Sequence, residues 1–237
     1  MATVGGMWLT VVGCSGSAPA VDSGCSCYLV EADGYRLVLD TGSGSAGPLQ
    51  RYVSATDLDL VVLSHAHSDH WADLTQLWYL RERSGGRPLT VVGPADLPPF
   101  GYDTDDSLRP RHATPVPFAA GPMTVRQAPV VHGECWATRI DDALCYTADT
   151  EPCAALDELA AGCRVLLAEA SGSDVDGPLP GHLTAGDAAR LAKRAGSRLL
   201  VLTHLRAWQH APSLLAEAAG IADCPVVLAA PGLRIAL

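Results

Sequence analysis

The segment SHAHSDH, residues 64–70, constrains this chain more than any other feature of its sequence. It directly follows the apolar run LDLVVL, which predicts a buried strand, and its last three residues begin a helical pattern over 68–83. The segment holds four side chains that can bind a metal ion: His65, His67, Asp69 and His70. Four such groups within six positions, where a strand gives way to a helix, indicate a metal site.

The rest of the chain predicts two packed sheets with helices outside them. Short runs rich in Val, Leu and Ile recur between turn residues and are typical of strands. Helical patterns cover 68–83, 151–162 and 183–196, the last with Thr184 as its N-cap and Asp187 three positions later. Two halves that each begin with strands favour an α+β sandwich. At 237 residues, we expect one domain spanning 1–237.

One region breaks this pattern. Residues 94–122 are dense in Pro, Gly and Asp and predict a long irregular loop. Arg109, Arg111 and His112 lie in it and would meet a phosphate if the loop folded over the site. An exposed, solvated loop is the simpler interpretation, so the function of this loop is left open.

Composition excludes several classes of partner. The chain has 16 basic and 26 acidic residues, a net charge of −10, which disfavours a large nucleic-acid partner but not a small anion. It has no run of about 20 apolar residues and no signal-peptide pattern at its start, so we expect a cytoplasmic protein that does not bind membranes.

The cysteines add no second metal motif. The sequence has eight cysteines and no CxxC pair, so we expect most of them to be small buried hydrophobic residues. Cys25 and Cys27 would face the same side of a strand, which leaves a thiolate site as the alternative. Without a second thiol pair, burial in the core is favoured.

Three more residues of the ligand type follow strand-like runs. His132 comes after APVV, Asp149 after LCYTA and His204 after LLVLT. With the four residues of the opening segment they make a set of seven. A dinuclear centre of zinc, manganese or iron explains this set, because two ions need a shared carboxylate to offset their repulsion. The alternative is that each histidine is separately satisfied in the core or at the surface.

The ligand pattern resembles that of the metallo-β-lactamase superfamily, whose His-x-His-x-Asp-His signature stands here at residues 65–70. The resemblance implies a four-layer αββα sandwich. It also implies that one metal is held by His65, His67 and His132, and the other by Asp69, His70 and His204. Asp149 would bridge the two ions. Asp40, in LVLDTGSG, is similar to the carboxylate with which the family orients a ligand histidine.

A further resemblance narrows the reaction. His182, in GHLTAGDAARLAKRAG, is similar to the histidine of the His-Ser/Thr motif in the tRNase Z-like phosphodiesterase branch. A metal-bridging hydroxide would attack phosphorus, and His182 would protonate the leaving alkoxide. LLAEAS resembles the branch's His-Glu-Ala-Thr element, which makes Glu169 the carboxylate that orients His182, although Ala168 and Ser171 depart from that pattern. We therefore predict His182, Glu169 and Asp69 as catalytic residues.

The substrate of this branch is expected to be small here. The long arm that grips tRNA is inserted between the ligands that match His132 and Asp149, but only sixteen residues separate these two. The short members hydrolyse small phosphodiesters, such as cyclic nucleotides or cyclic ribose phosphates. Trp71, Trp136 and Trp208 each follow a ligand closely and are candidate substrate contacts, although packing in the core or at the rim is the simpler interpretation for each.

Two other functions stay open from the sequence. The same metal set serves acyl hydrolases of the thioesterase, lactonase or lactamase type, which do not need His182. A non-catalytic metal-binding protein is the third alternative, disfavoured by the complete ligand set. Since relatives often dimerise, the resemblance also implies a homodimer.

Overall fold

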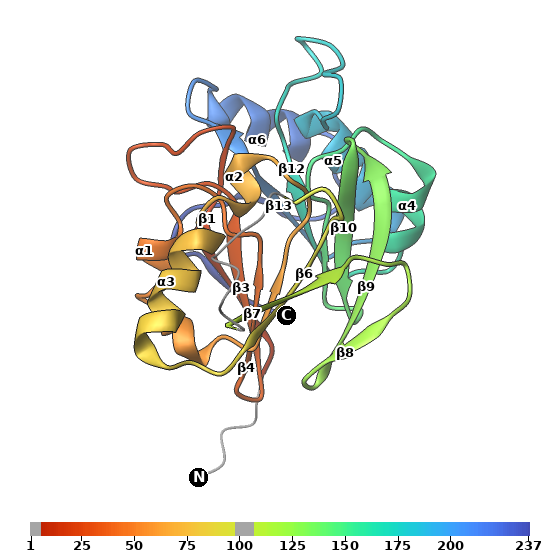
Figure 1. Ribbon diagram of the computed structural model, residues 1–237. Coiled ribbons are helices and arrows are strands. Elements are labelled where there is room, and N and C mark those ends of the chain that lie inside the picture. The colour runs from red at the N-terminus through yellow and green to blue at the C-terminus, as the bar shows by residue number, and fades with distance from the viewer. Residues whose placement is uncertain (1–5, 98–106) are drawn as a thin grey trace.

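The strands form two mixed sheets (Figure 1) in the computed structural model, which describes residues 6–97 and 107–237. The first sheet has the order β16 (Arg234–Ala236), β1 (Trp8–Gly13), β3 (Cys27–Ala32), β4 (Tyr35–Leu39), β5 (Leu60–Val62), β6 (Leu89–Gly93) and β7 (Leu108–His112). The second has the order β15 (Val226–Leu228), β13 (Leu199–Thr203), β12 (Val165–Glu169), β11 (Leu144–Tyr146), β10 (Glu134–Ile140), β9 (Met123–Val131) and β8 (Phe118–Ala120). A short ladder joins β2 (Ser15–Gly16) to β14 (Leu205–Arg206).

Strands of the first sheet are buried on both faces. Along β3, Tyr28 and Val30 belong to the core shared with the second sheet, whereas Cys27 and Leu29 belong to a separate core under the helices. Successive side chains of a strand point to opposite faces, so this alternation identifies the sheet as an inner layer. The near-continuous apolar runs in the sequence have this cause. Cys27 is therefore a core residue, as expected.

Helices cover the outer face of each sheet (Figure 1). On the first sheet lie α1 (Ala46–Leu49), the 3₁₀ turn η1 (Ala55–Asp57) and α3 (Leu74–Ser84), preceded by the short α2 (Ser68–Trp71). On the second lie α4 (Ala154–Ala160), α5 (Ala185–Ala195) and α6 (Ala211–Ala219). The predicted αββα sandwich is thus confirmed. In the described part of the chain, no helix has the length and apolar character needed to cross a bilayer.

The helix predicted over 68–83 is wrong as a single element. It is divided between α2 and α3 at Ala72 and Asp73. The amide of Asp73 donates to the carbonyl of Thr41 at 2.9 Å, and its carboxylate accepts from the amide of Ala46 at 2.7 Å. These bonds to Thr41 and to the first residue of α1 replace helical ones, a tertiary effect that periodicity does not reveal.

The continuous loop predicted over 94–122 is also wrong, because β7 and β8 lie within it. Residues 98–106 of this region lie outside the described residues. β7 reads LRPRH and pairs in parallel with β6 at the sheet edge. Proline is tolerated in an edge strand, because its missing N–H can face away from the sheet. Arg109, Arg111 and His112 are exposed on this strand.

The predicted N-cap of α5 is confirmed and offers a test of stability. The Thr184 hydroxyl accepts from the amide of Asp187 at 3.0 Å, and the Asp187 carboxylate accepts from the Thr184 amide at 3.2 Å. Losing such a cap costs about 1 kcal/mol. We expect Thr184→Ala to lower the melting temperature by about 2–4 °C in calorimetry. Thr184→Ser keeps the hydroxyl and should melt within about 1 °C of the wild type; equal losses in both variants would contradict the capping role.

Candidate metal centre

The predicted ligands meet at one edge of the sandwich. The strands β4, β5, β9, β11 and β13 end just before a residue of the predicted site. These residues are Asp40, His65, His132, Asp149 and His204. Since β11, β12 and β13 are parallel, as are β4 and β5, their carboxyl ends lie at the same edge of each sheet. The fold therefore gathers side chains that are far apart in the sequence.

One group of ligand atoms comes from three histidines. His67 Nδ1 lies 3.0 Å from Nε2 of His65 and 3.0 Å from Nε2 of His132. These three residues form a group that can hold a metal ion. Histidine nitrogens this close cannot all carry protons, whereas one cation between them satisfies all three lone pairs.

A second group lies beside the first. His204 Nε2 is 3.1 Å from Asp69 Oδ2, and His70 Nε2 is 3.6 Å from the same oxygen. Asp69, His70, Asp149 and His204 form a second group able to hold a metal. All four are buried, so a cation here would be shielded from water by protein.

Asp149 belongs to the second group and also faces the first. Its Oδ2 is 3.2 Å from His204 Nε2, 3.9 Å from His132 Nε2 and 4.0 Å from His65 Nε2. Its Oδ1 is 3.5 Å from His70 Nε2. The carboxylate thus faces ligands of both groups, which is the position that a bridging ligand requires.

Hydrogen bonds to Nδ1 hold the imidazole rings of three candidate ligands in place. His132 Nδ1 donates to the carbonyl of Gly181 at 2.7 Å, which leaves its Nε2 as the lone-pair nitrogen. His204 Nδ1 bonds to Ser171 Oγ at 2.7 Å, and His70 Nδ1 to Asp40 Oδ2 at 2.7 Å. The Asp40 contact agrees with the role predicted for this carboxylate.

Asp40 is itself held by several donors. Its oxygens accept from the amide and hydroxyl of Ser64 at 2.7 and 2.8 Å, and from the Tyr146 hydroxyl at 2.7 Å. Asp40 directly follows β4 of the first sheet, and Tyr146 lies in β11 of the second. One buried carboxylate thus connects both sheets behind the ligand His70.

Backbone strain concentrates at the same place. Asp40, Ala148 and His204 have φ values of +57°, +53° and +53°. Such values are uncommon for residues other than glycine, and they cluster at functional sites where surrounding contacts hold them. His204 is itself a candidate ligand, Ala148 precedes the candidate ligand Asp149, and Asp40 bonds to the candidate ligand His70.

The electrostatics favour a cation. Burial lowers the pKa of His65 and of His132, and neutral imidazole is the form that binds metals. Burial also opposes charge on His70, but Asp149 and Asp40 outweigh it and raise its pKa well above the ordinary range in the metal-free protein. In Asp149, burial opposes ionisation, yet His204 and His70 outweigh it and hold the pKa low. A metal ion would therefore displace a proton from His70.

Two buried polar atoms also indicate that these residues fit a bound cation. His70 Nε2 and Asp149 Oδ1, which lie 3.5 Å from each other, make no hydrogen bond among residues 6–97 and 107–237. Leaving buried polar atoms unpaired is costly, and both atoms point to the group that contains the other ligands. Imidazole and carboxylate donors suit zinc, manganese or iron, so the residues present fit a divalent metal.

His182 and Glu169 form a pair at the edge of the second group. His182 Nδ1 lies 2.9 Å from Glu169 Oε2 and 3.7 Å from Asp149 Oδ2. Glu169 also accepts from the amide of Thr150 at 2.6 Å. Burial lowers the pKa of His182, and burial and then Asp149 raise the pKa of Glu169 in the metal-free protein. With Nδ1 bonded to Glu169, the other ring nitrogen of His182 remains for a substrate.

The three predicted tryptophans are not equivalent. Trp71 donates to the carbonyl of Ala66 at 3.0 Å and packs against the first-sheet core, and Trp136 is half-buried against the core between the sheets. Trp208 is 68% exposed and lines a cavity. Arg111 contacts Phe118 on the exposed β7 edge, and no hydrogen bond or ion pair in the described chain joins it to the ligand groups. Trp208 thus remains the tryptophan best placed for a ligand.

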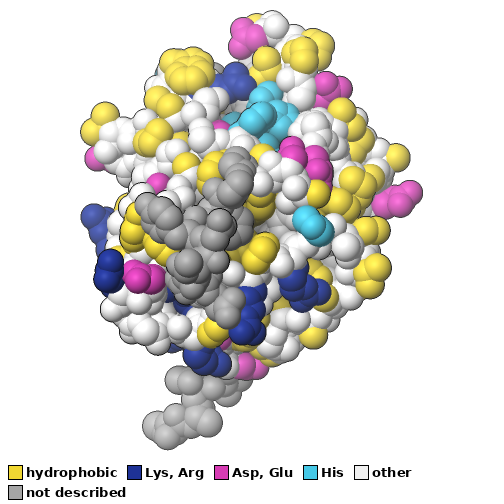
Figure 2. All heavy atoms as spheres, viewed as in Figure 1, with side chains coloured by type: hydrophobic (Ala, Val, Ile, Leu, Met, Phe, Trp, Pro, Cys, Tyr) yellow, Lys and Arg dark blue, Asp and Glu magenta, His cyan; other side chains and the backbone are white. Residues whose placement is uncertain are grey.

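Several residues of the site were not predicted. Ser17 donates its amide to Asp69 Oδ2 at 2.7 Å, and a Cβ on Gly16 would lie 2.6 Å from His204 Nδ1. Ser64, Tyr146 and Ser171 bond to Asp40 or to His204, as described above. The small residues of GCSGSA signal a close backbone approach, but the hydroxyl groups have no linear signature. Figure 2 shows histidines gathered in a hollow of the surface, with a basic side chain at its edge.

Comparison with known proteins identifies the family. A family model described as a beta-lactamase superfamily domain matches residues 35–205. The chain belongs to the beta-lactamase superfamily. A superfamily member from Bacillus subtilis, the probable metallo-hydrolase YhfI, is 34% identical over 215 residues, which cover 84% of this chain and 87% of YhfI. The crystal structure of YhfI has a TM-score of 0.89 at 31% identity and covers 98% of this chain and 99% of that one.

Other members of the superfamily are similar along most of the chain. Ribonuclease Z of Mycobacterium bovis is 31% identical over 241 residues, which cover 83% of this chain and 85% of that protein. A crystal structure of a diphosphatase from the PhnP family has a TM-score of 0.75 at 19% identity, with 98% of both chains covered, and shows the shared fold. The chain is therefore a metallo-hydrolase of the beta-lactamase fold whose His and Asp clusters can bind metal.

Proposed function

We propose that this metallo-hydrolase cleaves a small phosphodiester, of the cyclic nucleotide or cyclic phosphate type, with His182 as its general acid. The observation that carries the proposal is the bond between His182 Nδ1 and Glu169 Oε2, 2.9 Å long, beside the Asp149 carboxylate. An alkoxide leaving group needs a proton, and an imidazole oriented by a carboxylate can supply it. Attack on a carbonyl would not require this pair.

The ligand assignment follows the geometry of the two groups. His65, His67 and His132 would hold one divalent ion, Asp69, His70 and His204 the other, and Asp149 would face both. We favour zinc, since these donors suit it, with manganese or iron as alternatives. Bound ions supply an activated water and stabilise charge on phosphoryl oxygens. The protein's own part is to orient the ligands through Asp40, Gly181 and Ser171 and to hold a proton at His182.

A small substrate is favoured over a folded RNA. β10 and β11 are joined by the short turn 141–143, so no arm extends between the ligands His132 and Asp149. The net charge of −10 opposes binding of a long polyanion. Because ribonuclease Z is a relative, cleavage of precursor tRNA must be measured alongside that of small phosphodiesters.

A substrate panel tests the reaction class. The zinc- or manganese-loaded protein should hydrolyse bis-p-nitrophenyl phosphate and at least one 2′,3′- or 3′,5′-cyclic nucleotide, with kcat/KM at least about a hundredfold above that for acyl thioesters and lactones. Initial rates over the panel, with metal-stripped protein as the control, give the answer. Rapid thioester or lactone turnover without phosphodiester cleavage would reject the proposal, and efficient cleavage of precursor tRNA would reject the small substrate.

Acyl hydrolysis is the second candidate, and one observation favours it. Burial lowers the pKa of His182 and thus favours the neutral ring, although Asp149 opposes this shift. A neutral His182 suits a thiolate leaving group, which needs no proton. The substrate panel distinguishes this candidate from the first.

A further inference from the structure

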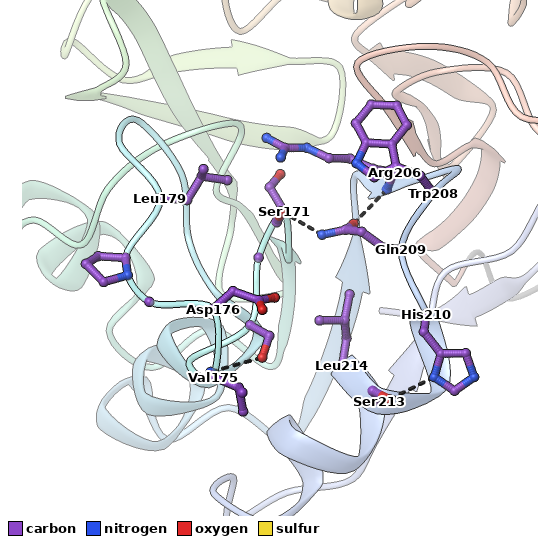
Figure 3. Close-up of a pocket in the computed structure, with 14 residues that line it drawn as sticks. Ser171, Val175, Asp176, Leu179, Arg206, Trp208, Gln209, His210, Ser213 and Leu214 are labelled. Carbon is purple, nitrogen blue, oxygen red and sulfur yellow. Dashed lines mark hydrogen bonds between the residues drawn. The ribbon is translucent and has the colours of Figure 1, made fainter.

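The segments 171–179 and 206–214 line a cavity of about 600 Å³ (Figure 3). Ser171 lines this cavity and bonds through Oγ to Nδ1 of the ligand His204. Gln209 connects the two walls, because it donates to the Ser171 carbonyl at 2.6 Å and accepts from the Arg206 amide at 2.9 Å. The cavity is large enough for a nucleoside, since small-molecule sites commonly measure about 300–1,000 Å³.

Arg206 brings a positive charge to the end of the cavity near Ser171 (Figure 3). Its Nε is buried and has no hydrogen-bond partner in the described part of the chain. An unpaired guanidinium N–H is costly to bury and fits a planar or tetrahedral anion. Burial and the Arg206 charge both lower the pKa of His182, so this charge also acts on the proposed acid. Asp176 lies farther along the cavity from Ser171 (Figure 3).

Apolar surface lines the same cavity. Trp208 is 68% exposed and Val175 is 91% exposed, and both line it. Figure 3 shows Trp208 at the Arg206 end. Exposed indole faces are stacking platforms for nucleobases, since every base has a flat aromatic surface.

We propose that this cavity binds the nucleoside part of the substrate, with Arg206 on a phosphoryl oxygen and Trp208 stacked on the base. The inference rests on the proposed phosphodiesterase activity and narrows its substrate to a nucleotide. Arg206 lies two residues after the ligand His204 and Trp208 four residues after it, so one segment connects metal binding to substrate recognition. The two side chains recognise different parts of one ligand, which makes their contributions separable.

Equilibrium binding separates the two contributions. Titration calorimetry on the zinc-loaded protein would use adenosine 5′-monophosphate, adenosine and inorganic phosphate as probes. Trp208→Ala should raise the Kd of the nucleotide and of adenosine about tenfold and leave that of phosphate unchanged. Arg206→Gln should raise the Kd of the nucleotide and of phosphate about tenfold and leave that of adenosine unchanged. Trp208→Phe should restore most of the nucleotide affinity.

A matched control and three outcomes complete the test. Arg83→Gln removes an exposed guanidinium on α3 and should alter none of the three affinities. If both cavity variants bind the nucleotide like wild type while cyclic nucleotides are hydrolysed, this inference fails and the proposed function stands. If the crossed binding pattern holds while no phosphodiester is cleaved, the proposed function fails and the nucleotide site stands. If Trp208→Ala changes only the oligomeric state, the surface joins two copies of the chain and the inference is overturned.

Discussion

Asp149→Asn is expected to lower metal affinity by more than about a hundredfold and to remove hydrolytic activity. The amide of the variant has nearly the same shape as the carboxylate but places no negative charge between the two ligand groups. The Asp149 oxygens lie within 4.0 Å of the nitrogens of His65, His132 and His204, so the change acts on both proposed ions. Metal content by mass spectrometry, after dialysis against limiting zinc, measures the effect directly.

The exposed Asp22 provides the matched control. Asp22→Asn makes the same chemical change at the surface and should keep wild-type metal content and activity. Wild-type metal content in Asp149→Asn would show that this carboxylate does not bridge the ions. Loss in both variants would show that net charge, rather than the position of Asp149, controls binding.

His182→Ala is expected to slow cyclic nucleotide hydrolysis by about 10²–10⁴-fold, the usual contribution of a general acid. Hydrolysis of bis-p-nitrophenyl phosphate should fall by less than about tenfold, because p-nitrophenolate leaves without a proton. The dependence on the leaving group separates proton donation from a general loss of structure. Steady-state kcat values for the two substrates, with metal content measured in parallel, give the comparison.

Glu169→Gln provides a graded control for the same pair. Glu169 positions His182 through the 2.9 Å bond. Cations bound at the neighbouring groups would oppose the upward shift of the Glu169 pKa and favour its carboxylate, whose negative charge in turn favours the protonated ring of His182. Removing that charge lowers the pKa of His182, so activity that needs the protonated ring should be lost at a lower pH than in the wild type. An unchanged pH profile in Glu169→Gln, or an equal loss on both substrates in His182→Ala, would contradict the proposed acid.

The convergence of the candidate ligands could be predicted because each follows an apolar run. His132, Asp149 and His204 stand within three residues of a strand end, and parallel strands bring such ends to one edge. Two packed sheets with helices outside follow from the same short apolar runs, and the resemblance implied their four-layer αββα order. No feature of the linear sequence, by contrast, pairs Asp40 with Tyr146, 106 residues away, because only the packed sheets bring them together.

The errors have the same origin. α2 and α3 separate at Asp73 because its amide and carboxylate bond to Thr41 and Ala46, and the helical period of 68–83 contains no trace of these partners. β7 forms from the polar segment LRPRH because β6 offers it an open edge. Arg206 was not singled out from the sequence because the cavity that it lines is formed together with Ser171, which follows a different strand.

The division of the ligands between the two sheets has a consequence for the folded state itself. His65, His67, Asp69 and His70 follow β5, whereas His132, Asp149 and His204 follow strands of the second sheet. A bound ion would therefore act as a removable cross-link between the halves of the sandwich, and a ligand that binds only the native state stabilises it by mass action. Resistance to heat and to proteases would then follow the metal supply of the cell, so that metal starvation removes the protein as well as its activity.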